Sequence, residues 1–201
     1  MNTSPESLIP YYTSKSHVTG WFINNFYKSL HNVLGDRQVK KVLEVGCGEG
    51  WSTSRIRGFF VSDDVEFDAI EIDPMFAENS RRLNPSVNIE IGSIYDLADR
   101  QAELVICLEV LEHLDDPATA LERLFAVSSR WVLLSVPREP LWSVLNLLRG
   151  KYIRGMGNTP GHLQKWSRSK FVDLVSQYGR VIEIANPIPW TIVLAEVRIP
   201  R

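Results

Sequence analysis

The sequence has few cysteines and no long hydrophobic run. Only Cys47 and Cys107 occur among the 201 residues, too few for a disulfide framework and outside any Cys/His spacing typical of a metal site. Apolar stretches such as 131–134 fall far short of the roughly 18 residues of a membrane-spanning helix. The first twenty residues lack a basic start followed by an apolar run. We therefore expect a cytoplasmic protein with reduced thiols, no secretion signal and no bound metal.

The remaining composition is that of one globular domain. Apolar residues make up 44% of the chain, aromatic residues 10% and charged residues 23%, which excludes disordered, collagen-like and coiled-coil classes. A length of 201 residues is sufficient for a single hydrophobic core. We expect one domain over 1–201, with an N-terminal helical cap at 1–35 and a lid-like basic insert at 137–166.

The pattern of apolar residues predicts alternating strands and helices. Short β-branched runs indicate strands at 39–45, 65–72, 87–91, 104–108 and 131–136. The spacing of apolar residues by three or four positions, together with capping residues, indicates helices at 18–34, 75–83, 118–127 and 168–178. Such alternation favours right-handed crossovers and a mostly parallel sheet. The runs 181–185 and 191–197 are too close for a crossover, so they should form an antiparallel hairpin on the sheet edge.

The most informative segment is the glycine-rich run VLEVGCGEG at 42–50, which follows a predicted strand. Its spacing is Gly46-x-Gly48-x-Gly50, and Trp51 stands where the dinucleotide-binding pattern G-x-G-x-x-G requires a glycine. An NAD-dependent oxidoreductase is therefore disfavoured, and a phosphate-binding P-loop is excluded because its lysine is missing. A simple tight turn remains the alternative. Glu71, at the end of the next strand, is placed to accept hydrogen bonds from a ribose diol.

Three segments in order, 42–50, AIEIDP at 69–74 and ELVICLEVLEHL at 103–114, resemble the motifs of class I S-adenosylmethionine-dependent methyltransferases. The likeness is greatest to the small-molecule branch that includes quinone-biosynthesis enzymes. It implies a single-domain α/β, Rossmann-like fold whose seven strands have the order 3-2-1-4-5-7-6, with an antiparallel last strand. It also implies S-adenosylmethionine as the methyl donor and S-adenosylhomocysteine as the product.

The resemblance implies a cofactor site at the carboxyl ends of the first four strands, made by Glu44, Gly46, Cys47, Gly48, Glu71, Ile72, Ser93, Ile94, Leu108 and Glu109. Glu71 would bind the ribose and Ile72 would pack against the adenine. Ser93 departs from the family, which commonly has an aspartate there, and leaves the adenine amino group to a hydroxyl or a backbone carbonyl. This departure keeps open a second hypothesis, a catalytically inactive ligand-binding or scaffold protein of the same fold.

Methyl transfer to oxygen or nitrogen of a small acceptor is the function that these motifs favour. His113 follows the fourth strand and is the candidate general base, with a purely structural histidine as the alternative. The candidate substrate or lid residues are Tyr11, Tyr12, Trp142 and His162. Of these, His162 is the weakest candidate, because a surface-loop residue is the competing interpretation. DNA-methylating motifs are missing, so we expect a small-molecule acceptor and no nucleic-acid partner.

Charge is distributed unevenly along the chain. Residues 137–170 carry seven basic side chains against one acid, whereas the other 15 basic and 23 acidic residues leave the rest of the chain at −8. The same segment holds Leu141, Val144, Leu145 and Leu148 at helical spacing. Three interpretations stay open: a lid over an acidic or lipid-like acceptor, peripheral contact with an anionic membrane through 137–170, or a helix packed on its own domain.

Overall fold

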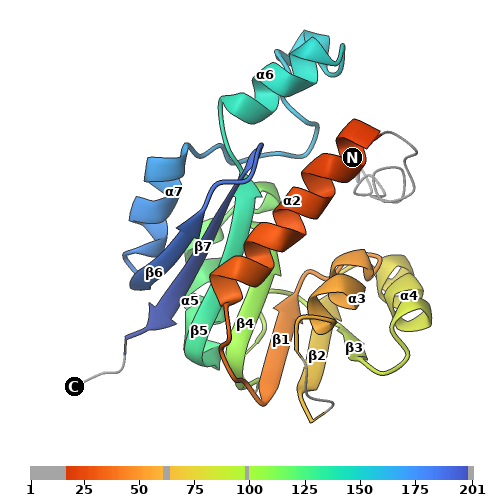
Figure 1. The fold of residues 1–201 in the computed structure, drawn as a ribbon, viewed down its shortest axis with the longest axis vertical. Coiled ribbons are helices and arrows are strands. Elements are labelled where there is room, and N and C mark those ends of the chain that lie inside the picture. The colour runs from red at the N-terminus through yellow and green to blue at the C-terminus, as the bar shows by residue number, and fades with distance from the viewer. Residues whose placement is uncertain (1–16, 61–63, 98–99, 199–201) are drawn as a thin grey trace.

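The computed structural model describes residues 17–60, 64–97 and 100–198, which form a seven-stranded sheet covered by helices (Figure 1). The strand order is β3-β2-β1-β4-β5-β7-β6. The strands are β1 (Lys41–Val45), β2 (Glu66–Glu71), β3 (Asn88–Ile91), β4 (Ala102–Leu108), β5 (Ser128–Pro137), β6 (Gly179–Ala185) and β7 (Trp190–Val197). All pairs among β1–β5 are parallel, whereas β7 runs antiparallel to β5 and β6. The predicted order and the terminal hairpin are confirmed.

The helices cover both faces of this sheet. They are α2 (His17–Leu34), α3 (Trp51–Arg57), α4 (Pro74–Leu83), α5 (Pro117–Val127), α6 (Leu141–Leu148) and α7 (Arg168–Val175), with short 3₁₀ turns η1 (Leu111–His113) and η2 (Ile153–Gly155). Helices α2, α3 and α4 pack into one hydrophobic cluster, and α5 and α7 into the other. Cys47 and Cys107 are free and buried, as expected of small core residues. No helix among the described residues combines the length and the apolar character needed to cross a membrane.

Local capping explains where several helices begin. Asp73 accepts hydrogen bonds from the backbone N–H groups of Met75 and Phe76, and Asp116 accepts one from Thr119. Proline follows each aspartate at the first helical position, where its missing N–H has no helical partner to lose. Ser167 caps α7 in the same way. The helix starts predicted from the Asp-Pro pairs are therefore confirmed.

The register brings the carboxyl ends of β1–β4 to one edge of the sheet. Val45 of β1 lies beside Ile70 of β2, and Glu71 lies beside Ile91 of β3. The loops that follow these strands therefore meet at this edge, where parallel α/β sheets bind their ligands. The N-terminal helical cap is represented by α2, which contacts β6 and β7. Tyr11 and Tyr12 lie outside the described residues.

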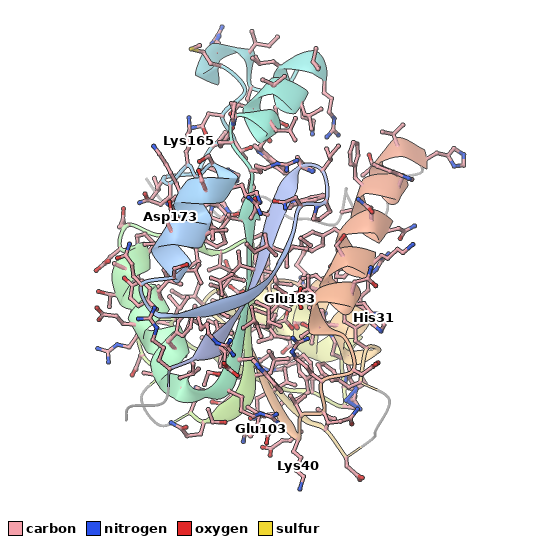
Figure 2. All side chains as sticks on the ribbon, turned by 60° about the vertical axis from the view of Figure 1, so that its left-hand side comes forward. His31, Lys40, Glu103, Lys165, Asp173 and Glu183 are labelled. Carbon is pink, nitrogen blue, oxygen red and sulfur yellow. The ribbon has the colours of Figure 1, made fainter. Side chains whose placement is uncertain are left out.

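The predicted basic insert leaves the sheet at the end of β5, and its two ends lie side by side. A parallel bridge joins Arg138 to Trp166, and the backbone N–H of Glu139 donates to the carbonyl of Trp166 at 2.9 Å. Between these ends the chain forms α6 and η2, which extend beyond the rest of the molecule (Figure 1). In Figure 2 this extension is at the opposite end of the molecule from Lys40 and Glu103. Trp142 of α6 packs against the hydrophobic core, and the three interpretations of the insert stay predictions.

Candidate functional site

The glycine loop turns sharply after β1 and is fixed to β2. The N–H groups of Gly46 and Cys47 both donate to the Ile70 carbonyl, at 2.9 and 3.1 Å. Gly46 and Gly48 have φ angles of 81° and 55°, a region that favours glycine. A Cβ atom on Gly46 would collide with Cγ2 of Val110, whereas a Cβ on Gly48 would meet nothing within 4 Å. The loop is therefore packed on one side and open on the other.

Glu71 holds this loop in place. Its carboxylate accepts hydrogen bonds from the N–H of Gly48 at 2.8 Å and from the N–H of Asp73 at 3.0 Å, and the side chain is buried. A carboxylate can accept about four hydrogen bonds. Two sites therefore remain for ligand hydroxyls, and Glu71 has a structural role that the sequence interpretation did not include.

Glu44 places a second carboxyl group beside the start of α3. Its Oε1 accepts from the Ser52 hydroxyl at 2.7 Å, and burial raises the pKa of the carboxyl group. The buried Oε2 has no hydrogen-bond partner of normal geometry, although the nearby Thr53 hydroxyl favours the ionised form. Buried polar atoms are normally paired. A cationic or hydrogen-donating ligand group would satisfy this atom.

The residues expected near an adenine differ in exposure. Ile72 is 69% exposed at the carboxyl end of β2, an apolar side chain available to cover a planar ring. Ser93 is half-buried, and its Oγ accepts from the N–H of Tyr95 at 3.2 Å. Ile94 is buried and packs into the core. The exposed and half-buried members of this predicted set are thus Ile72 and Ser93.

Leu108 and Glu109 end β4 at the same edge. Leu108 is buried, and Glu109 has a φ angle of 57°, which turns the chain after the strand. Oε1 of Glu109 accepts from the Ser135 hydroxyl at 2.7 Å, and the Trp190 indole is a further hydrogen-bonding neighbour. Burial raises the pKa of the Glu109 carboxyl group. An acidic group that gains protons near neutral pH therefore lies beside the end of β4.

Aromatic and imidazole rings gather above this edge. The rings of His113 and His162 meet edge to face with centroids 4.9 Å apart. Trp142 stacks on His162 at 5.9 Å and lies 6.0 Å from Trp190. His162 lies in a loop and is half-buried, with its ring against Trp142 and His113. Two predicted candidates from separate segments, His113 and His162, are thus neighbours.

One ring nitrogen of His113 is held by the insert. Nδ1 lies 3.1 Å from the carbonyl oxygen of Gly161, and a carbonyl can only accept a hydrogen bond. Nδ1 therefore carries the proton in the neutral ring, which leaves a lone pair on Nε2. Loss of solvation lowers the pKa of His113 and lowers that of His162 to about 4. Both rings are consequently neutral near pH 7.

Glu112, His113 and His162 together could hold a cation. Their candidate ligand atoms all lie within 4.8 Å of one another, slightly wider than the roughly 3–4 Å that separates ligands of one bound ion. Glu112 is 2% exposed, and its Oε2 has no hydrogen-bond partner. Burial and the neighbouring Glu109 raise the pKa of its carboxyl group.

Sequence reasoning missed two members of this site. Glu112 stands next to His113 in the third motif, and that adjacency was a usable signal. Trp190 lies just before the predicted strand 191–197, is buried, and contacts Phe26 and Trp142. No sequence signal pairs Trp190 with residues so far away in the chain, because only the β5–β7–β6 arrangement brings them together.

Comparisons with known proteins agree with this geometry. A family model described as a methyltransferase domain matches residues 22–183. The ubiquinone biosynthesis O-methyltransferase of Pseudomonas fluorescens is 29% identical over 179 residues, covering 74% of this chain and 75% of that protein. The mitochondrial enzyme of the same description from Saccharomyces cerevisiae is 25% identical over 181 residues, covering 83% of this chain but only 58% of the yeast protein.

Solved structures share the fold at low identity. Magnesium protoporphyrin IX methyltransferase from Synechocystis, with bound S-adenosylhomocysteine, has a TM-score of 0.67 at 16% identity over 91% of this chain and 88% of that chain. The N-methyltransferase NodS from Bradyrhizobium japonicum, in complex with S-adenosylhomocysteine, also has a TM-score of 0.67. It is 13% identical, and the match covers 94% of this chain and 92% of that chain. These likenesses confirm the predicted fold.

Proposed function

The chain belongs to this family of S-adenosylmethionine-dependent methyltransferases, and we propose that it methylates a hydroxyl oxygen of a small, apolar or lipid-like acceptor. The observation that carries this proposal is the contact of His113 Nδ1 with the Gly161 carbonyl, which leaves Nε2 of the neutral ring free to accept a proton next to the aromatic rings above the carboxyl edge of the sheet. A neutral imidazole at that position can remove the proton of an acceptor hydroxyl.

The residues at the sheet edge fit S-adenosylmethionine. The open side of the loop at Gly48 leaves space for a close backbone approach, and the unpaired Oε2 of Glu44 suits a positively charged amino group. Glu71 has lone pairs left for the ribose, and Ile72 offers an exposed apolar surface for the adenine. The Ser93 hydroxyl stands beside them. Glu44, Gly48, Glu71, Ile72 and Ser93 would thus hold the methyl donor.

When bound, S-adenosylmethionine supplies an electrophilic methyl group on a sulfonium sulfur. Nε2 of His113 would take the proton of the acceptor hydroxyl, whose oxygen would then be the nucleophile toward that methyl group. Trp142, His162 and Trp190 exclude water and present ring faces to an apolar acceptor. The protein contributes alignment and proton removal, and the product is a methyl ether.

The relatives favour oxygen as the acceptor atom. Two of them, from Pseudomonas fluorescens and yeast, are described as ubiquinone biosynthesis O-methyltransferases. We extend the O-methyl assignment to this chain as a proposal, with a ring hydroxyl as the nucleophile. Both cysteines are free and buried, consistent with activity in a reducing, cytoplasmic compartment. Transfer of a labelled methyl group to catechols with and without an alkyl tail would test the acceptor class directly.

Binding of the cofactor gives the first prediction. Titration calorimetry should show S-adenosylhomocysteine binding, and Glu71→Ala should weaken it by about 1.5–3 kcal/mol because hydrogen bonds to a charged group are lost. The variant also loses the acceptor of the Gly48 N–H, so its unfolding should be followed by circular dichroism to separate affinity from stability.

Glu66→Ala is the matched control, because Glu66 begins the same strand, is exposed, and pairs with Lys41 at the other end. Its affinity for S-adenosylhomocysteine should equal that of the wild type. Binding of NAD without binding of S-adenosylhomocysteine would contradict the cofactor assignment. An equal loss of affinity for S-adenosylhomocysteine in both variants would show that Glu71 has no specific role in binding.

A second candidate mechanism is cation-assisted transfer. The observation that favours it is the buried, unpartnered Oε2 of Glu112 beside His113 and His162. A divalent cation held there would orient the acceptor oxygen and lower its pKa. This proposal differs from the base mechanism in requiring Glu112 and His162 as ligands.

Chelation separates the two mechanisms. If a cation is needed, dialysis against EDTA abolishes methyl transfer, added Mg²⁺ or Zn²⁺ restores it, and calorimetry detects metal binding that Glu112→Gln removes. Glu122→Gln, an exposed change on α5, should leave metal binding intact. Full methyl transfer after chelation would reject the cation and leave His113 to act as base alone.

A further inference from the structure

Helix α6 exposes several apolar residues and buries a polar one. Its only fully buried residue is Asn146, whereas Val144, Leu147 and Leu148 are exposed, Leu148 by 79%. Trp142 joins the helix to the hydrophobic core. A surface helix normally turns its apolar residues inward. In α6 much of the apolar surface faces away from the body of the protein.

Polar contacts hold the protruding segment, defined as residues 140–160, in this arrangement. Nδ2 of Asn146 donates to the Gly157 carbonyl at 2.9 Å, and the Asn146 carbonyl accepts from the N–H of Lys151 at 2.8 Å. The Trp142 indole donates to the Thr159 hydroxyl at 2.9 Å. Gly157 has a φ angle of 80° and packs directly on Ser143, where no Cβ would fit. Hydrogen bonds and close backbone packing, and not an apolar core, thus hold the segment together.

The far end of the segment exposes further apolar side chains. Ile153 is 67% exposed and Met156 is 79% exposed, on a compact turn that includes η2. Together with Val144, Leu147 and Leu148 they form what we call the apolar tip. Figures 1 and 2 show this segment projecting from one end of the molecule. A projecting apolar surface of this kind suits insertion into a lipid bilayer better than docking of a globular protein.

Basic side chains lie next to the apolar tip. Residues 140–160 contain Arg149, Lys151 and Arg154 and no acidic residue, whereas the whole chain has a net charge of −2. Arg149 and Arg154 are exposed and form no salt bridge with any residue that the structure describes. Apolar residues flanked by Arg and Lys are the combination that binds the interface of an anionic bilayer.

We propose that the apolar tip and Arg149, Lys151 and Arg154 dock the protein peripherally on an anionic lipid bilayer. Leu148, Ile153 and Met156 enter the region between head groups and acyl chains, while the three cations contact lipid phosphates. Trp142, at the base of the segment, stacks on His162, so docking brings the acceptor side of the site close to the membrane. The proposal goes beyond methyl transfer and does not depend on it.

Charge complementarity favours a bilayer over a second copy of this chain. Two apolar tips meeting each other would also bring two cationic clusters together, which repel at moderate salt. A lid that closes on its own domain is the other alternative. In that case the tip becomes buried when ligands bind, and vesicle binding is absent.

Co-sedimentation with vesicles tests the proposal on the full chain. Wild-type protein should bind vesicles that contain phosphatidylglycerol and release as salt is raised, and it should bind pure phosphatidylcholine weakly. Changing Arg149, Lys151 and Arg154 together to glutamate should lower the partition constant at least about 100-fold. Changing Leu148, Ile153 and Met156 together to serine should lower it by about as much while keeping the charge.

The matched control replaces Lys28, Lys40 and Arg123 with glutamate. These exposed residues carry the same charge and lie outside the segment, with Lys40 at the opposite end of the molecule (Figure 2). The control should bind vesicles within about threefold of the wild type, because charges beyond a Debye length contribute little. S-adenosylhomocysteine affinity and circular dichroism should be unchanged in all three variants, which shows that they fold.

Three results would overturn the proposal. The first is wild-type protein that stays in solution with anionic vesicles at low salt. The second is equal loss of binding in the control and in the Arg149/Lys151/Arg154 variant, which would reduce the effect to net charge. The third is a wild-type dimer, seen by light scattering, that the serine variant converts to a monomer and that binds no vesicles, because the tip would then be an interface between two copies.

Discussion

Methyl transfer by the His113→Ala variant should be at least about 100-fold slower than by the wild type, with nearly unchanged affinity for S-adenosylhomocysteine. Removing a positioned general base typically costs a factor of about 100 to 10,000. His113 is anchored through Nδ1 to the Gly161 carbonyl, so the imidazole is fixed in position before the acceptor arrives. Single-turnover measurements with a labelled methyl group would isolate the chemical step from product release.

His31→Ala is the comparison for this variant. His31 is an exposed histidine in the last turn of α2 (Figure 2), where it meets Phe59 edge to face. Its removal should leave the rate of transfer unchanged. Added imidazole should partly restore the His113→Ala rate if Nε2 removes a proton. A His113→Ala enzyme with the wild-type rate would reduce His113 to a structural residue that holds the insert.

Gly50→Ala should lower the free energy of unfolding by about 2–5 kcal/mol. Gly50 has a φ angle of 86°, and an added Cβ would lie 2.5 Å from the Ser80 hydroxyl oxygen and 2.8 Å from Ser80 Cα. The backbone conformation alone costs an alanine about 1–2 kcal/mol, and overpacking adds about 1–3 kcal/mol. Urea unfolding followed by circular dichroism would measure the loss.

Gly48→Ala separates the two contributions. Gly48 also has a positive φ, but a Cβ there would meet nothing within 4 Å. Its cost should therefore be confined to about 1–2 kcal/mol of backbone strain. Equal losses of unfolding free energy at both positions would mean that small shifts relieve the contact of the new Cβ with Ser80. The close packing of α3 on α4 would then not be the reason for glycine at position 50.

The elements set by local patterns were predictable from sequence. The Asp73-Pro74 and Asp116-Pro117 caps, the glycine loop and the strand ends of β1, β2 and β4 all depend on residues close together in the chain. The sheet order came from the family resemblance, and only the terminal hairpin was derived from spacing. These features position the residues that we propose to hold the methyl donor.

The acceptor half depends on contacts that no local pattern encodes. His113 meets Gly161 and His162 only because the insert returns over the end of β4, and Trp190 arrives from the last hairpin. The apolar spacing of α6 predicted a helix correctly but could not reveal that its buried residue is Asn146. The segment that packs against a short helix decides which of its faces is buried. Here that segment includes Gly157, which packs against Ser143 of α6.

The bridge between Arg138 and Trp166 also makes the insert a separable module. Because its two ends lie side by side, a shorter or unrelated segment can join β5 to α7 without changing the pairing of any strand. The residues at the ends of β1 and β2 that we propose to hold the methyl donor are not part of this segment. Exchanging residues 139–165 as one unit should therefore alter the choice of acceptor and leave the binding of S-adenosylhomocysteine unchanged.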